Sequence, residues 1–147
     1  MRKIIVFSGA ALLLLVLASC AQPNKSLYYG TWIGQHGFIK KSVHNVDGTI
    51  ENYFSLTDPT PTEKAKAQIV KCWADSEGNT WFQTEATILE GPNKNSVPKV
   101  QTLERVNKAG SFEEVMANGV VEFNPSSFPV KIDPNNQFYM TFTRAEK

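Results

Sequence analysis

The segment TWFQTEATIL, residues 80–89, decides the fold class of this chain. Two sets of side chains alternate along it: Phe82, Thr84, Ala86 and Ile88, and between them Trp81, Gln83, Glu85 and Thr87. A period of two residues is typical of a β-strand, because successive side chains point to opposite faces of a sheet. The turn-forming run Asp75-Ser76-Glu77-Gly78-Asn79 precedes this segment. The segment is therefore predicted to be the second strand of a hairpin.

The same alternation recurs through most of the chain beyond residue 27. The dipeptides Asp47-Gly48 and Asn118-Gly119 are typical of tight hairpins, since glycine accepts the positive φ that these turns need. About eight antiparallel strands are predicted. They cover residues 28–34, 50–56, 67–74, 80–89, 100–106, 112–116, 120–123 and 137–144. Because closure removes unpaired edges, we expect an all-β, antiparallel up-and-down β-barrel.

The segment from Thr60 to Trp73 is consistent with either a helix or a strand. Thr60-Pro61-Thr62-Glu63 has the form of a capping box, and Ala65, Ile69 and Trp73 would share one helical face. The β-branched and aromatic residues of 68–73 indicate a strand instead. The sequence favours a strand from about Ala67 to Ala74, with at most a short helical turn before it.

The start of the chain has the features of a secretory signal peptide. Arg2 and Lys3 precede an apolar run from Ile4 to Leu17, and small residues lead from there to Cys20. This run is shorter than the ~20 apolar residues that a membrane-spanning helix needs. We therefore expect residues 1–19 to be removed.

The tetrapeptide Leu17-Ala18-Ser19-Cys20 resembles the lipobox of bacterial lipoproteins. This resemblance implies a diacylglyceryl thioether on Cys20, cleavage before that residue, and N-acylation of the new terminus, so that the protein is anchored to a membrane of the bacterial cell envelope. Ala21, in place of an aspartate, favours the outer membrane. Residues 20–27 would then be the lipidated cysteine and a polar tether, and residues 28–147 the folded domain.

The composition favours one small domain without affinity for nucleic acid. The chain has 147 residues, of which 41% are hydrophobic and 20% are charged. Its 15 basic and 14 acidic side chains nearly balance, whereas nucleic-acid binding depends on clustered Lys and Arg. We predict no nucleic-acid partner, and the sequence identifies no protein partner.

Short motifs near the beginning and the end of the predicted domain's sequence are similar to those of a known family. Gly30-Thr31-Trp32 resembles the G-x-W motif of lipocalins and fatty-acid-binding proteins, the calycin group. Arg144 stands where that group places a basic residue over the tryptophan ring. Together with the lipobox, the pattern resembles small bacterial lipocalin-like lipoproteins. The resemblance implies a lipocalin-like barrel in which Gly30, Trp32 and Arg144 close one end and have structural roles.

No pattern typical of a catalytic, cofactor or metal centre occurs in the sequence. His36 and His44 are expected at loops or strand ends, partly exposed, with no third ligand at metal-binding spacing. Glu113 and Glu114 are adjacent, which places them on opposite faces of a strand and prevents a shared-proton pair between them. Cys72 fits a small buried apolar side chain. We predict a protein that is not an enzyme and has no cofactor or metal.

Two functions remain open at this point. In the first, the barrel interior binds a small hydrophobic or amphipathic molecule. In the second, the barrel is packed solid and acts through its surface as an interaction module of the cell envelope. For the first function, the residues expected to line the ligand site are Ile50, Phe54, Phe82, Ile88, Phe138, Met140 and Phe142.

Overall fold

The computed structural model describes residues 23–117 and 122–146. The predicted signal peptide, Cys20 and the hairpin dipeptide Asn118-Gly119 lie outside the described residues. Within the described part of the chain, no helix is long and apolar enough to cross a membrane.

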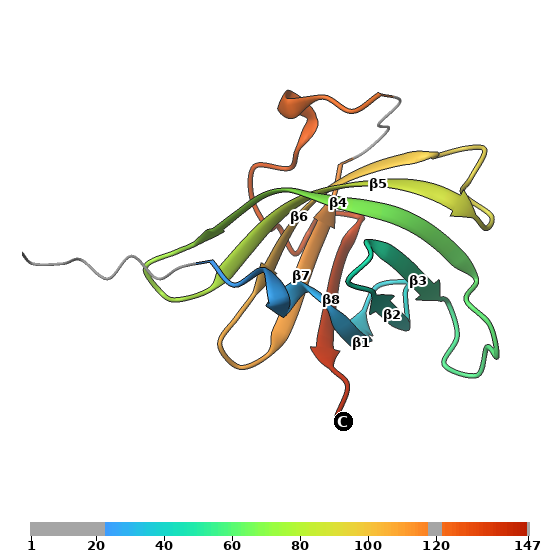
Figure 1. Cartoon of the computed structure of the whole chain (residues 1–147), viewed down its shortest axis with the longest axis horizontal. Helices are drawn as coiled ribbons and strands as arrows, with labels where there is room; N and C mark the ends of the chain where they lie inside the picture. Colours follow the sequence, from blue (N-terminus) through green and yellow to red (C-terminus); the bar gives the residue numbers. More distant parts are fainter. Residues whose placement is uncertain (1–22, 118–121, 147) are drawn as a thin grey trace, which may run out of the picture.

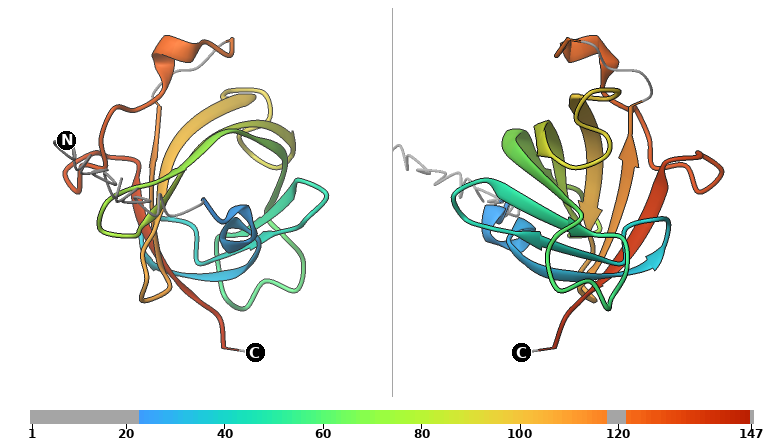
Figure 2. Two further views of the ribbon diagram at one scale, coloured as in Figure 1. Left: turned by 60° about the vertical axis from the view of Figure 1, so that its left-hand side comes forward. Right: turned by 90° about the vertical axis from the view of Figure 1, so that its right-hand side faces the viewer.

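Eight antiparallel strands form one closed barrel, which confirms the predicted fold class. Each strand pairs with the next along the chain, and β8 pairs with β1 (Figure 1 and Figure 2). The strands are β1 (Gly30–His36), β2 (Lys41–His44), β3 (Thr49–Tyr53), β4 (Glu63–Ala74), β5 (Thr80–Glu90), β6 (Lys99–Val106), β7 (Ser111–Met116) and β8 (Tyr139–Arg144). Two short 3-10 helices, η1 (Lys25–Tyr28) and η2 (Pro125–Ser127), complete the secondary structure of these residues.

The set of strands differs from the predicted set in two places. β2 was not predicted, because its inward side chains are Ser42 and His44 and give no apolar alternation. A strand was predicted at 120–123; of these residues, Glu122 and Phe123 are not in a strand and the other two lie outside the described residues. The connection from β7 to β8 instead contains η2, with Pro125 at its start.

Residues 63–74 form the long strand β4, which confirms the strand favoured for about Ala67 to Ala74 but begins four residues earlier, and no helical turn precedes it. The capping-box residues serve another purpose: the Thr62 hydroxyl accepts a hydrogen bond from the Phe54 amide at 3.2 Å. The register against β5 shifts between Ile69 and Lys71. This bulge brings both Ile69 and Cys72 against the interior although they are three positions apart.

One end of the barrel is closed by Trp32, which is fully buried. Trp32 stacks on Phe112 with ring centroids 5.0 Å apart, and its Nε1 donates to the Tyr28 carbonyl at 3.2 Å. Arg144, the register partner of Trp32 on β8, places its Cζ atom 4.2 Å from the indole centroid. The predicted structural contact between Trp32 and Arg144 is therefore present.

The Arg144 guanidinium also fastens the start of the fold to its end. It donates to the carbonyls of Leu27 and Tyr29 at 2.7 and 2.9 Å. Gly30 has a φ of +130°, and a Cβ there would lie 2.6 Å from Arg144 Nη1, so glycine is required at this position. Because η1 takes part in this closure, the folded body includes Lys25–Leu27, which were expected to belong to the tether.

The connections between strands divide between the two ends of the barrel, since neighbouring strands run in opposite directions. The β2–β3, β4–β5 and β6–β7 turns share the end at which Trp32 lies, and the other connections share the opposite end. In Figure 1, the β4–β5 and β6–β7 turns lie on the left, and the β3–β4 and β5–β6 connections lie on the right. We call these the closed end and the open end.

We predict that Trp32→Ala destabilises the protein by about 3–5 kcal/mol, because the closed end loses its largest buried side chain. The matched control is Trp73→Ala, which removes a partly exposed indole from the outer wall and should lose less, because only part of this side chain is buried and its stacking on Trp81 adds ~0.5–1.5 kcal/mol. Urea denaturation of the full chain measures both free energies. Equal losses in the two variants would contradict the closing role of Trp32.

A cavity inside the barrel

The barrel encloses a cavity of about 440 Å³. This volume falls in the range of small-molecule sites, which is ~300–1,000 Å³. Residues of all four connections at the open end contribute to its lining, whereas Trp32 and Phe112 seal the opposite end. Side chains at the open end that line the cavity are Phe38, Ile39, Phe54, Asn93, Val97, Ala117 and Phe138.

Four of the seven residues predicted to line a ligand site do line this cavity: Ile50, Phe54, Ile88 and Phe138. Phe82, Met140 and Phe142 do not; they are fully buried in the same core cluster as Trp32 and Phe112. Phe142 is the register partner of Phe112, whereas Met140 lies nearer the open end, beside Gly37. All seven side chains face the interior. The alternation of side chains predicts which face a residue is on, but not how far along the barrel axis it lies. The cavity is bounded by residues nearer the open end of each strand.

Two glutamates face each other inside the barrel. Glu104 on β6 and Glu114 on β7 are register partners, and their side chains are 2% and 9% exposed. Directly opposite residues of neighbouring strands have Cβ atoms about 4.5–5.5 Å apart. Both side chains line the cavity, so the barrel contains a carboxyl pair that sequence reasoning missed.

The carboxyl of Glu104 is only half satisfied. Its Oε1 lies 2.6 Å from the Thr102 hydroxyl and 3.0 Å from that of Thr84, while the two hydroxyls lie 2.5 Å from each other. Its Oε2 is buried and has no hydrogen-bond partner, and the same holds for the hydroxyl of Tyr28, which also lines the cavity. Buried polar atoms without a partner are rare in folded proteins and call for an explanation.

The electrostatics of the site favour protonated carboxyls when the cavity is empty. Burial raises the pKa of Glu104 to about 7. Burial, and then the nearby charge of Glu104, raises the pKa of Glu114 well above its ordinary value. Burial and the same two carboxyls raise the pKa of Tyr28. In each case, the low-dielectric interior disfavours the charged form.

His44 is buried beside this group, which corrects the expectation that both histidines are partly exposed. Its Nδ1 lies 3.1 Å from the Tyr28 carbonyl, an acceptor, so Nδ1 carries the proton. Burial lowers the pKa of His44 to about 4, and the imidazole is therefore neutral at neutral pH. His36 ends β1 and is exposed. Among the described residues, no cluster of three or more His, Cys, Asp and Glu side chains could hold a metal ion.

A second polar group lies on the wall formed by β2, β3 and β4. The Ser42 hydroxyl donates to Asn52 Oδ1 at 2.7 Å. The Glu63 carboxyl accepts from the Asn93 side chain at 2.9 Å and from that of Asn52 at 3.5 Å. Unlike Glu104, this carboxyl has a partner for each oxygen, so the polar atoms on this wall are satisfied within the protein.

The alternation of side chains along each strand could have identified the polar residues that line the cavity, because residues two positions apart share a face. Thr84 shares its face with Phe82 and Ala86, and Glu114 shares its face with Phe112 and Met116. The residues adjacent to Glu104 and Glu114 point outward, as this alternation requires: on the outer wall, Arg105 Nε donates to Glu113 Oε2 at 2.8 Å. Alternation alone does not show that Glu104 and Glu114 meet, because that depends on the register of β6 against β7.

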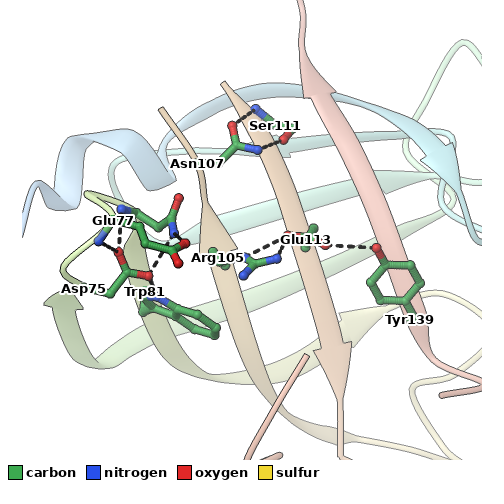
Figure 3. A network of polar contacts seen from close by, with 9 residues as sticks. Asp75, Glu77, Trp81, Arg105, Asn107, Ser111, Glu113 and Tyr139 are labelled. Carbon is green, nitrogen blue, oxygen red and sulfur yellow. Dashed lines mark hydrogen bonds and ion pairs between the residues drawn. The ribbon is translucent and has the colours of Figure 1, made fainter. Parts of the chain in front are cut away.

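The outer wall carries its own polar and aromatic network (Figure 3). Trp81 Nε1 donates to Asp75 Oδ2 at 2.7 Å, and hydrogen bonds from Trp81 and Asn79 hold the pKa of Asp75 far below its ordinary value. Arg105 lies 5.2 Å from the Trp81 ring, and Glu113 accepts from Tyr139 at 3.0 Å. The network therefore ties the β4–β5 turn to β6, β7 and the start of β8.

A shallow groove lies on this outer wall, beside two stacked indoles. Trp73 and Trp81 have ring centroids 5.9 Å apart at an interplanar angle of 10°. Both line the groove, with Leu103 below and Phe128 on the segment after η2. Cys72 points instead toward the interior core as a partly buried free thiol whose pKa is raised by burial, in keeping with an apolar role.

We expect the buried carboxyl to make stability depend on pH. Between pH 4.5, its ordinary pKa, and about 7, the folded state holds more protons on Glu104 than the unfolded state does. The contribution of Glu104 to stability is therefore lost as pH rises through this range. Glu104→Gln removes this titrating group. As pH rises through this range, the free energy of unfolding of the variant minus that of the wild type should therefore increase, by at most about 1.4 kcal/mol per pH unit.

Chemical denaturation of both proteins at a series of pH values measures this difference. Glu114→Gln should shift in the same sense, because it removes the partner carboxyl. Parallel pH profiles for the wild type and both variants would contradict a buried, proton-holding pair.

Comparison of the chain with models of known protein families, with curated proteins and with solved structures gives no match. The function is therefore inferred from the geometry and chemistry of the barrel itself.

Proposed function

We propose that this protein is a lipid-anchored, lipocalin-like barrel of the bacterial cell envelope that binds a small hydrophobic or amphipathic molecule in its interior. The cavity of about 440 Å³ is the observation that carries this proposal. A barrel that served only as a scaffold would gain stability by filling such a space, because each missing methylene removes packing and hydrophobic energy.

The arrangement of the two ends supports both parts of the proposal. The chain enters the fold through η1 at the closed end, shortly after Cys20 in the sequence. The cavity is lined by the connections of the opposite end. A lipid on Cys20 would therefore hold the closed end near the bilayer and leave the open end accessible to ligand. By the sequence analogy, the membrane is the outer membrane.

A second function, binding a protein partner through the outer wall, is favoured by one observation. The stacked pair Trp73 and Trp81 lines a surface groove, and aromatic residues are enriched at binding surfaces. This function does not need the interior cavity, so variants of the two regions distinguish the two proposals.

Ligand binding is tested with N-phenyl-1-naphthylamine, a neutral apolar dye, and the full chain in lipid nanodiscs. Ala86→Trp places an indole in the cavity and should weaken dye binding by at least about tenfold. The matched control is Thr87→Trp, on the outward face of the same strand, which should bind the dye as the wild type does.

Fluorescence titration, corrected with empty nanodiscs, gives the two affinities. Equal binding by the wild type and Ala86→Trp would contradict ligand binding in the barrel. Dye binding that is lost in Trp73→Ala instead would favour the outer groove.

Lipid attachment is tested by expressing the full chain with radiolabelled palmitate in a Gram-negative host. We expect label on the wild type and on Cys72→Ser, and none on Cys20→Ser, because only a thiol forms the thioether. Cys20→Ser should also leave the membrane fraction. Label that persists on Cys20→Ser would contradict the proposed anchor.

A further inference from the structure

Among the described residues that line the cavity there are acidic side chains but no lysine or arginine, and His44 is neutral at neutral pH. Its three carboxyls belong to Glu63, Glu104 and Glu114. Arg144 lies across Trp32 at the closed end, where it is engaged by the carbonyls of Leu27 and Tyr29. The interior therefore has a surplus of hydrogen-bond acceptors that no protein cation neutralises.

We propose that the ligand is an organic cation, a primary amine with an apolar body, whose ammonium group binds between Glu104 and Glu114. This inference rests on the proposed function and specifies its ligand class. The apolar body would lie toward the open end, against Ile50, Phe54 and Ile88. The ligand would then enter with its amino group first.

The buried oxygens that lack a hydrogen-bond partner could accept hydrogen bonds from an ammonium group. Glu104 Oε2 and the Tyr28 hydroxyl are buried and lack partners, and both residues line the cavity. Among the described residues, none donates a hydrogen bond to Glu114. An ammonium has three N–H donors and no acceptor. It could donate one hydrogen bond each to Glu104 Oε2, to a Glu114 oxygen and to the Tyr28 oxygen, so that all three side chains gain a partner.

Other ligand heads fit this site less well. A carboxylate head would lie beside two carboxyls with no cation to balance its charge. Neighbouring negative charges disfavour the ionised form of each carboxyl. A metal ion would find only two carboxyls and hydroxyl groups, whereas Ca²⁺ takes six to eight oxygen ligands. A neutral head with a single donor would satisfy only one of the open acceptors.

A purely structural role for the pair leaves its geometry unexplained. Two protonated glutamates could satisfy each other across the strands, yet Glu104 Oε2 has no partner. An unsatisfied buried oxygen destabilises a fold, because the atom has lost its hydrogen bonds to water and gained none in the protein. The satisfied group around Glu63 shows that this same barrel can complete the hydrogen bonds of a buried carboxyl when only structure requires it.

Binding of an ammonium should be linked to proton release. The groups that face Glu104 are Glu114 from β7, Tyr28 from η1, Thr84 from β5 and neutral His44 from β2. Because burial raises the pKa of both carboxyls, the empty site is protonated at mildly acidic pH, and the cation must displace a proton. The affinity for an amine should therefore rise between pH 6 and pH 8, while an alcohol should show no such change.

The test compares three probes with the same alkyl chain: n-hexylamine, hexanoate and 1-hexanol. Isothermal titration calorimetry with the full chain in nanodiscs, corrected with empty nanodiscs, measures each affinity at two pH values. At the higher pH, we expect hexylamine to bind at least about tenfold more tightly than either other probe, since hydrogen bonds to charged groups supply this much.

Two variants locate the effect. Glu104→Gln keeps the shape of the side chain and should weaken hexylamine by roughly ten- to hundredfold while changing 1-hexanol by less than about threefold. Glu113→Gln, the adjacent residue on the outer wall, should leave all three affinities unchanged. Unfolding curves of each variant establish that it is folded before binding is compared.

The outcomes separate this inference from the proposed function. If 1-hexanol or hexanoate binds as tightly as hexylamine, or if Glu104→Gln leaves hexylamine binding intact, the cationic ligand class is wrong and the binding cavity stands. If none of the probes nor the naphthylamine dye binds, the proposed ligand-binding function itself is overturned. An amine preference lost in Glu104→Gln and retained in Glu113→Gln supports the inference.

Discussion

The pairing of β1 with β8 at Trp32 and Arg144 is the interaction on which the rest of the structure depends. It joins the beginning and the end of the chain, removes the last two free edges of the sheet and places the largest side chain of the interior at one end. With Phe82, Phe112 and Phe142 packed around the indole, the closed end takes most of the aromatic core. The walls of the opposite half include the small side chains of Ala65 and Ala86, and this half contains the cavity.

This division explains how a small barrel can be stable and still contain a site. The closed end supplies the packing, while the hollow half places polar groups that a solid core would exclude. Glu104, Glu114 and the Tyr28 hydroxyl meet at the boundary between the two halves, beneath the apolar walls. Glu104 Oε2 and the Tyr28 hydroxyl have no hydrogen-bond partner, and this is why we propose that a ligand binds there.

The sequence was informative where side chains alternate and uninformative where position along a strand or register matters. The pattern of β5 predicted a strand whose buried residues are those of the structure, from Phe82 to Ile88. β2 was not predicted, because its inward residues Ser42 and His44 are polar and give no alternation of apolar and polar side chains. Alternation identified Phe82 and Ile88 alike as interior residues, although only Ile88 reaches the cavity. Glu104 and Glu114 became a pair only through the register between β6 and β7, which no local pattern encodes.

The central claim is that one half of this barrel is hollow and presents an unpaired carboxyl to the hollow space. A high-resolution crystal structure of the protein purified from its native host would test this directly. We expect an open interior between Ile50, Ile88 and Glu104, occupied by a bound molecule or ordered water that contacts Glu104 Oε2. Side chains that fill this space, or a protein group hydrogen bonded to that oxygen, would contradict it.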